Sequence, residues 1–251
     1  MTERANNAKT ASGSWRLFGR GRPNVDIAVL SVFVLVASVI AVFQLPGAHT
    51  PIEDSGWPAL LVVGIAFAVA ELTVFHFQFR REAIGFSVSE VPAAIALVFL
   101  SPIAAVAVRV VASSAALLSM RRPPLHKFLF NVSLFAMEMT AAVWLFDILI
   151  EGGGAPSSRL VPAAFATLVV TGCLGSILLT FVISRYEGDF LARTITVVKL
   201  EWWLFAVNAA IACMMLALVL LSPWLAFVGL MPISAAWYVL KAFGAINQRL
   251  R

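Results

Sequence analysis

The chain has 251 residues, of which 61% are hydrophobic and only 12% are charged, and its formal net charge is +5. Its mean hydropathy is +0.94. This value and the recurring apolar runs of about 18 or more residues exclude a soluble globular domain and predict a polytopic membrane protein. The excess of basic residues suits anchoring at anionic lipid headgroups. The expected partner is therefore the lipid bilayer, and we expect no nucleic acid partner.

Polar and turn-forming residues divide the sequence into eight predicted transmembrane helices, so the expected fold class is an all-α polytopic membrane protein. The helices are predicted at residues 26–45, 58–79, 90–100, 102–119, 126–149, 161–184, 202–221 and 224–241. The expected regions are a basic cytoplasmic tail at 1–25, a membrane-embedded helical domain at 26–241, and a cytoplasmic continuation of the last helix at 242–251.

The stretch FHFQFRREAIGFSVSEVP at 75–92 interrupts the apolar pattern with charged and alternating residues. The helix predicted at 90–100 is too short to cross a bilayer alone, because a crossing needs about 20 residues. The preceding residues 83–90 must therefore complete it. Non-helical backbone at this depth is tolerated only where protein or water satisfies its polar groups. We predict a short helix that is entered by a partly unwound segment shielded from lipid.

An alternating path through the predicted helices places the basic residues on one side of the membrane. Of the 18 lysines and arginines, only Arg109, inside a span, and Arg159, on the opposite side, do not fall on the side of the N-terminal tail. By the positive-inside bias, that side is the cytoplasm. We therefore predict a multi-pass protein of the cell (plasma) membrane with both termini in the cytoplasm.

Short sequences recur at corresponding positions of the two halves. LSP at 100–102 links the third and fourth helices, and LSP at 221–223 links the seventh and eighth. RRE at 80–82 has a counterpart in RYE at 185–187. Four helices followed by four would give a parallel pseudo-repeat. Shared turn chemistry explains the tripeptides almost as well.

Polar residues inside the predicted spans are costly to insert and therefore suggest function. Glu71, Arg109 and Glu138 lie in the interiors of the second, fourth and fifth helices. Asn131 lies seven residues before Glu138 on the same helical face. One interpretation is a structural lock, in which Arg109 pairs with Glu71 or Glu138. The other is a polar cavity that binds a ligand or a proton.

Glu90 stands at the start of the short helix. Pro92 disfavours a helical conformation at Val91, and a helix that begins near Glu90 directs free backbone N–H groups toward the unwound segment. Glu90 either caps this helix or faces a cavity shared with Asn131 and Glu138, where a polar or cationic ligand would bind. The candidate ligand-binding residues are Glu71, Glu90, Arg109, Asn131 and Glu138.

The sequence contains no motif typical of an enzyme, such as HExxH, GxSxG or a glycine-rich phosphate loop. Cys173 and Cys213 both fall within predicted helices and are interpreted as small core residues. No CxxC spacing indicates a metal site. We therefore expect no catalytic residue, no metal site and no cofactor within these residues.

The segment from 79 to 138 carries a resemblance to a known family. FRREAIGFSVSEVPAAIALVFLSP is followed by RRPPLHKFLFNVSLFAMEMTAA. In the second segment, Lys127, Phe130, Asn131 and Phe135 match a K-x-x-F-N-x-x-x-F helix start. Together the segments resemble the multi-helix membrane input region found ahead of GGDEF, EAL or HD-GYP output domains in bacterial, especially actinobacterial, cyclic di-GMP signalling proteins. The resemblance implies a sensor in the bacterial inner membrane.

The resemblance also implies a cytoplasmic output domain, and none occurs before Arg251. Either these residues are the membrane part of a longer protein, or they form a stand-alone protein with the input fold. In both cases we expect a sensor that perceives a ligand or membrane state and passes it through the last helix to a cytoplasmic signalling domain or within a homodimer. The alternatives are a small-molecule transporter or substrate-binding membrane subunit, and a scaffold without a ligand.

Overall fold

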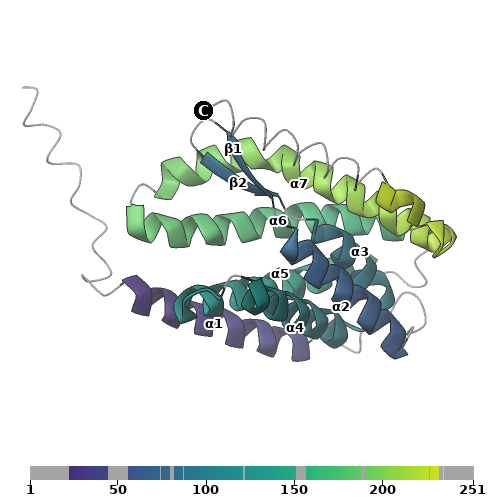
Figure 1. The fold of residues 1–251 in the computed structure, drawn as a ribbon, viewed down its shortest axis with the longest axis horizontal. Helices are drawn as coiled ribbons and strands as arrows, with labels where there is room; N and C mark the ends of the chain where they lie inside the picture. The colour runs from purple at the N-terminus through teal and green to yellow at the C-terminus, as the bar shows by residue number, and fades with distance from the viewer. Residues whose placement is uncertain are drawn as a thin grey trace, which may run out of the picture.

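The computed structural model describes residues 23–44, 56–73, 75–79, 82–86, 88–120, 122–150, 157–187, 190–225, 227–231 and 234. The predicted basic tail, apart from its last three residues, and the predicted C-terminal continuation lie outside this part of the chain. The elements in chain order are α1 (Pro23–Phe43), α2 (Gly56–Leu72), β1 (Phe75–Phe79), β2 (Glu82–Phe86), α3 (Glu90–Phe99), α4 (Pro102–Met120), α5 (Leu125–Ile150), α6 (Ser157–Glu187) and α7 (Phe190–Leu221) (Figure 1). Helical residues continue at 225 and 227–231, so the described residues form eight helices.

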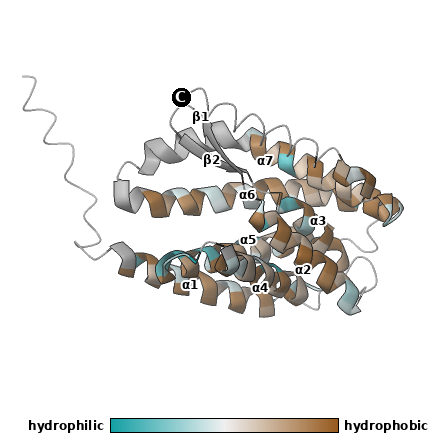
Figure 2. Ribbon diagram, viewed as in Figure 1, coloured by the Kyte–Doolittle hydropathy of each residue, from teal (hydrophilic) through white to brown (hydrophobic). Residues whose placement is uncertain are grey.

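Five helices in the described part of the chain, α1, α4, α5, α6 and α7, are long and apolar enough to cross a membrane. The apolar helices α2 and α3 are shorter, with 17 and 10 residues. Hydrophobic residues predominate along the described helices (Figure 2). Large apolar side chains are exposed on the spans, including Phe33 at 71% and Val111 at 67%. Exposed apolar surface of this extent needs lipid to cover it. The protein is therefore an integral, multi-pass helical membrane protein, as the sequence predicts.

The second helix is shorter than predicted, because it ends at Leu72 instead of residue 79. The Thr73 hydroxyl donates to the Val69 carbonyl at 2.9 Å and satisfies one of the last helical acceptors. The next residues, FHFQF, form β1, which pairs antiparallel with β2. Aromatic residues at alternate positions favour a strand over a helix. The described fold is therefore all-α, as predicted, with one short two-stranded hairpin between α2 and α3.

A hairpin directly precedes the short helix α3. Phe79 pairs with Glu82, so only residues 80 and 81 separate the two strands. α3 begins at Glu90 and has 10 residues. The prediction of a short helix with a non-helical entry is therefore confirmed. Shielding of that entry from lipid stays a prediction, because the hairpin side chains lie outside the described residues.

The seventh helix is longer than predicted, because it begins at Phe190 instead of residue 202. Its apolar span starts only at Trp203, but no glycine or proline interrupts residues 190–201. The helix can therefore extend beyond the apolar run. The four-plus-four repeat stays a prediction. It would relate the third helix to the seventh, and these two helices, α3 and α7, differ in length, with 10 and 32 residues.

α3 lies at the centre of the helix packing. It contacts α2, α4, α5, α6 and α7, and its residues Ala94, Ala96 and Val98 are 0% exposed. α6 and α7 run side by side, and α1, α4 and α5 form a second group (Figure 1). Small residues allow helices to approach closely within a membrane. α3 thus contacts both the pair α6 and α7 and the group that contains α4 and α5, and side chains from both lie close to its N-terminal end.

Reporter fusions test the predicted topology. A fusion after Arg251 or at Arg121 should report the cytoplasm, and a fusion at Gly153 should report the opposite side, because the basic loops are expected in the cytoplasm. These three positions lie outside the described residues. Paired alkaline phosphatase and fluorescent protein reporters correct each signal for expression. A cytoplasmic signal at Gly153 would contradict the eight-helix topology.

Candidate functional site

Arg109, within the α4 span, is a charged residue that is only 6% exposed. Its guanidinium carbon lies 4.8 Å from the ring centroid of Phe67 on α2. The same atom lies 4.8 Å from the ring centroid of Phe135 on α5. Aromatic rings at this distance attract a cation through their π faces. Two neighbouring helices therefore fix the position of the guanidinium.

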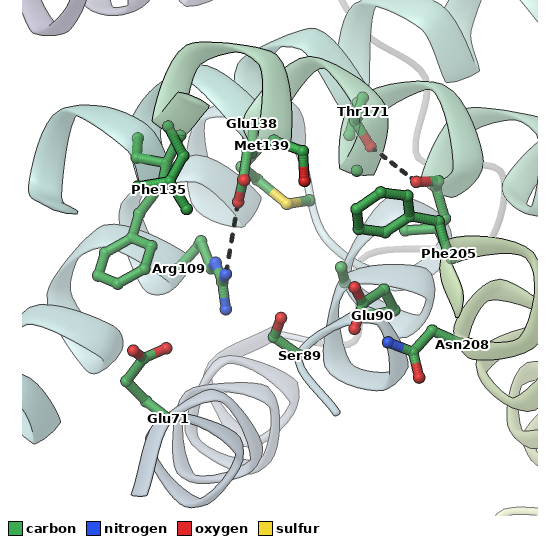
Figure 3. A pocket seen from close by; sticks show the side chains of 18 of the residues that line it. Glu71, Ser89, Glu90, Arg109, Phe135, Glu138, Met139, Thr171, Phe205 and Asn208 are labelled. Carbon is green, nitrogen blue, oxygen red and sulfur yellow. Dashed lines mark hydrogen bonds and ion pairs between the residues drawn. The ribbon is translucent and has the colours of Figure 1, made fainter. Parts of the chain in front are cut away.

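An ion pair joins Arg109 to α5. Nη2 of Arg109 lies 3.7 Å from Oε2 of Glu138 (Figure 3). A strong charge-assisted hydrogen bond between nitrogen and oxygen is shorter, about 2.7–2.9 Å. Nη1 of the same guanidinium is buried and has no hydrogen-bond partner among the described residues. The predicted ion pair is therefore present between Arg109 and Glu138, but it leaves one buried donor unpaired.

A glycine on the next helix makes room for Glu138. The Glu138 carboxylate lies against Gly175 on α6, so close that an added Cβ at Gly175 would overlap Oε1 and lie 3.0 Å from Cδ. Any larger residue at this position would force the carboxylate to move. Because position 175 is glycine, α5 and α6 can approach each other with the carboxylate between them and within reach of Arg109.

Glu90 is the first residue of α3. The side chains of Asn208 on α7 and of Ser89 are close enough to donate hydrogen bonds to its carboxylate, which also interacts with the backbone N–H of Glu90 itself. Oε2 of Glu90 is buried and has no hydrogen-bond partner in the described part of the chain. Ser89 is the N-cap residue of α3 and makes no side-chain capping hydrogen bond, so Glu90 is the first helical residue and not the cap. Glu90 still has one oxygen available to another group.

These side chains surround one cavity with a volume of about 380 Å³ (Figure 3). Its walls include every residue that the sequence suggested for a ligand site: Glu71, Glu90, Arg109, Asn131 and Glu138. They come from four helices, α2, α3, α4 and α5. Small-molecule sites commonly have volumes of about 300–1,000 Å³. The structure thus brings all the candidate residues together around a space large enough for a small molecule.

The charges around the cavity are unequal. Glu71 and Glu90 are each close enough to Glu138 to interact with it electrostatically, and so is Arg109. Among the described residues that line the cavity, three are acidic, Glu71, Glu90 and Glu138, and one is basic, Arg109. No group of three or more His, Cys, Asp or Glu residues within the described chain is close enough together to hold a metal ion. Acidic and basic side chains thus both line the cavity, which suits a polar ligand.

Several residues of the site were not among those predicted. Asn208 lines the cavity, and a lone asparagine inside the apolar span Trp203–Leu221 is the kind of signal that identified Asn131. Phe67 and Gly175 give no such signal, because apolar residues and glycine are common in membrane helices. Their roles follow only from the packing.

Glu90→Gln separates the two roles of Glu90, because glutamine keeps much of the shape and removes the charge. We expect the free energy of unfolding to change by at most about 1 kcal/mol, the size of a helix-cap effect. We also expect the variant to lose stabilisation by a ligand. Thermal unfolding with and without ligand measures both. Asn131→Ala should lose the same response, and a full response in both variants would contradict a role of these residues in binding.

Comparison with known proteins identifies no family for the chain. No family model matches it, and neither a curated protein nor a solved structure matches it. The resemblance to input regions of cyclic di-GMP signalling proteins therefore enters only as support for a proposal. The fold and the site establish a multi-helix integral membrane protein with a polar cavity between its helices.

Proposed function

We propose that the protein is a ligand-sensing membrane module, in which a small polar molecule binds in the cavity and changes the packing of α3 against α7. The observation that carries this proposal is the unpaired Nη1 of Arg109. This charged donor belongs to a residue that is 6% exposed and lines a cavity of about 380 Å³.

An incomplete ion pair suits a ligand site better than a structural lock. A buried polar group that lacks its hydrogen bond lowers stability. Replacing a buried ion pair by apolar residues of similar volume is often neutral or stabilising. A pair kept for stability alone is therefore expected to be fully hydrogen-bonded. The unpaired donor of Arg109 and the unpaired acceptor of Glu90 would gain partners when a polar ligand binds.

α3 and α7 connect the cavity to the C-terminal part of the chain. Glu90 lines the cavity from the start of α3, whereas Phe205 and Asn208 line it from α7. α3 packs directly against α7. A ligand shifts a conformational equilibrium only through a difference in affinity for the two states. A ligand at Glu90 would favour the packing of α3 and α7 that binds it best, and α7 leads to the helical residues 227–231.

The resemblance to input regions of cyclic di-GMP signalling proteins also supports transmission from the cavity toward the C-terminal part of the chain. An input region of the cyclic di-GMP signalling type would pass the change in packing to a cytoplasmic output domain or to a second copy in a homodimer. Any nucleotide chemistry would then belong to the output domain. Within this chain, the expected roles are ligand binding and transmission of the change through the helices.

The short apolar helix α3, which a hairpin separates from α2, favours a second function, transport. Substrate sites of secondary transporters are commonly formed by discontinuous helices whose ends point at the ligand. Glu90 lines the cavity from the first residue of such a short helix. A small-molecule transporter would use the same cavity but would open it alternately to the two sides of the membrane.

The two functions can be tested on the same purified protein. Thermal unfolding in the presence of small polar metabolites, measured for the wild type and Asn131→Ala, identifies compounds that raise the Tm of the wild type alone. For such a compound, sensing predicts slower hydrogen exchange in α3 and α7 and no accumulation in proteoliposomes. Accumulation would favour transport. If no polar compound gives Asn131-dependent stabilisation, both functions are wrong and a scaffold remains.

A further inference from the structure

The two unpaired atoms in the cavity have opposite requirements. Nη1 of Arg109 is a cationic donor and Oε2 of Glu90 is an acceptor, and neither has a hydrogen-bond partner in the part of the chain that the structure describes. The two residues interact electrostatically, but the ion pair of Arg109 is with Glu138. Figure 3 shows Arg109 and Glu90 as separate groups around the cavity. A ligand that satisfies both must offer an acceptor to Arg109 and a donor to Glu90.

We infer that the cavity binds a small zwitterion, with its anionic group at Arg109 and its ammonium or guanidinium group at Glu90. This inference rests on the proposed ligand-binding function and names the class of ligand. A carboxylate accepts hydrogen bonds from the planar guanidinium in the fork geometry that arginine favours. An ammonium group has three donors and no acceptor, which suits the free oxygen of Glu90.

Neither a simple cation nor a simple anion satisfies both positions. A cation alone would pair with Glu90 and leave the Arg109 donor buried without a partner. An anion alone would pair with Arg109 but would bring a further negative charge close to Glu71, Glu90 and Glu138. A zwitterion pairs both atoms and adds no net charge. The unpaired donor of Arg109 would lower the affinity for a simple cation, and the repulsion from the carboxylates would lower the affinity for a simple anion.

The remaining walls indicate the size of the ligand. Met139 and Phe205 contribute apolar surface, and Asn131 contributes an amide. Pockets of this kind enclose most of a ligand between apolar walls and fix its orientation through a few polar groups. A volume of about 380 Å³ is large enough for a molecule of amino-acid size. The apolar side chains would contact the body of the ligand between its two charged ends.

Matched compounds test the two charged ends separately. Glycine, β-alanine and 4-aminobutyrate are zwitterions with increasing distance between their charges. The controls for each are the amine that lacks the carboxylate and the acid that lacks the ammonium group, such as propylamine and butyrate for 4-aminobutyrate. With the wild-type protein in lipid nanodiscs, at least one zwitterion should raise the Tm. Its amine and acid controls should each bind at least about tenfold more weakly.

Variants assign the cationic end to its residue. Glu90→Gln should lower the affinity for the bound zwitterion by at least about tenfold, because the charge-assisted hydrogen bond is lost. The affinity of the acid control, which has no group for Glu90, should not fall. An equal loss for the acid and the zwitterion would show that the substitution alters the cavity in general and would overturn the assignment.

The outcomes separate this inference from the proposed function. Equal stabilisation by the amine control would show a cation site, and equal stabilisation by the acid control would show an anion site; either result would overturn the inference. If no zwitterion raises the Tm while another polar compound does so in an Asn131-dependent manner, the ligand class is wrong and the proposed function stands. If no polar compound raises the Tm in an Asn131-dependent manner, both the ligand class and the proposed function are wrong.

Discussion

Arg109→Leu is expected to lower the free energy of unfolding by about 3–5 kcal/mol, the range measured when one partner of a buried ion pair is removed. Glu138 would be left inside a membrane span without the guanidinium that now lies 3.7 Å away, so it must either stay ionised without a partner or take up a proton, and both cost stability. Glu71 and Glu90 also interact with Glu138 and would repel it. Thermal unfolding of the detergent-purified protein should therefore show a large fall in Tm.

The double variant Arg109→Leu/Glu138→Leu should be more stable than Arg109→Leu alone, because it removes the uncompensated carboxylate together with its partner. Arg109→Leu/Glu71→Leu is the matched control and should recover less, because the ion pair is with Glu138. Strictly additive losses for Arg109 and Glu138 would show that the two side chains do not interact, which would contradict the site geometry.

Gly175→Ala is expected to destabilise the protein by about 1–3 kcal/mol, the cost of overpacking a close-packed interior. The direction is informative, because the same change inside a helix normally stabilises by about 0.5–1 kcal/mol. The added Cβ would overlap the Glu138 Oε1 atom. The carboxylate would have to turn away, and its interaction with Arg109 would weaken. Thermal unfolding again measures the effect.

Substitutions at position 138 provide the controls. In a Glu138→Ala background the new methyl group has space, so Gly175→Ala should cost little. In a Glu138→Gln background the side chain has nearly the same shape, so the cost should remain. Gly64→Ala tests the generic effect, because an added Cβ there lies 3.2 Å from Cγ2 of Val108 and needs only a small adjustment. An equal loss in the Glu138→Ala background would place the damage elsewhere.

Helix boundaries could be predicted where an apolar run ends at turn-forming residues. α5 (Leu125–Ile150) differs from the predicted 126–149 by one residue at each end, because Pro124 precedes it and Gly152 follows shortly after. The apolar pattern predicts α2 too long, because hydropathy does not distinguish an apolar strand from a helix. It predicts α7 too short, because an apolar run marks the membrane span and not the whole helix.

The members of the site could be predicted, but their arrangement could not. Charged and amide side chains inside apolar spans are conspicuous in a sequence, and this identified Arg109 and its possible partners. Whether Glu71 or Glu138 pairs with it depends on how the helices rotate and cross, which sequence spacing does not give for residues on separate helices. The aromatic ring of Phe67 and the space at Gly175 depend on the same packing.

Cysteine accessibility in membranes tests most directly whether the polar residues surround an open cavity or form a closed lock. Ala93 on α3 and Ser176 on α6 line the cavity, whereas Val111 on α4 is 67% exposed on the outer face. In a background in which Cys173 and Cys213 are replaced by serine, Ala93→Cys, Ser176→Cys and Val111→Cys are each treated with a charged, membrane-impermeant methanethiosulfonate.

A polar cavity predicts that Ala93→Cys and Ser176→Cys react, and that Val111→Cys, in contact with lipid, does not, because the reaction needs a hydrated thiolate. A cationic reagent should react faster than an anionic one, because three carboxylates and one guanidinium surround the cavity. If neither cavity cysteine reacts faster than Val111→Cys, the polar residues form a closed lock, and both the ligand site and the proposed sensing function are wrong.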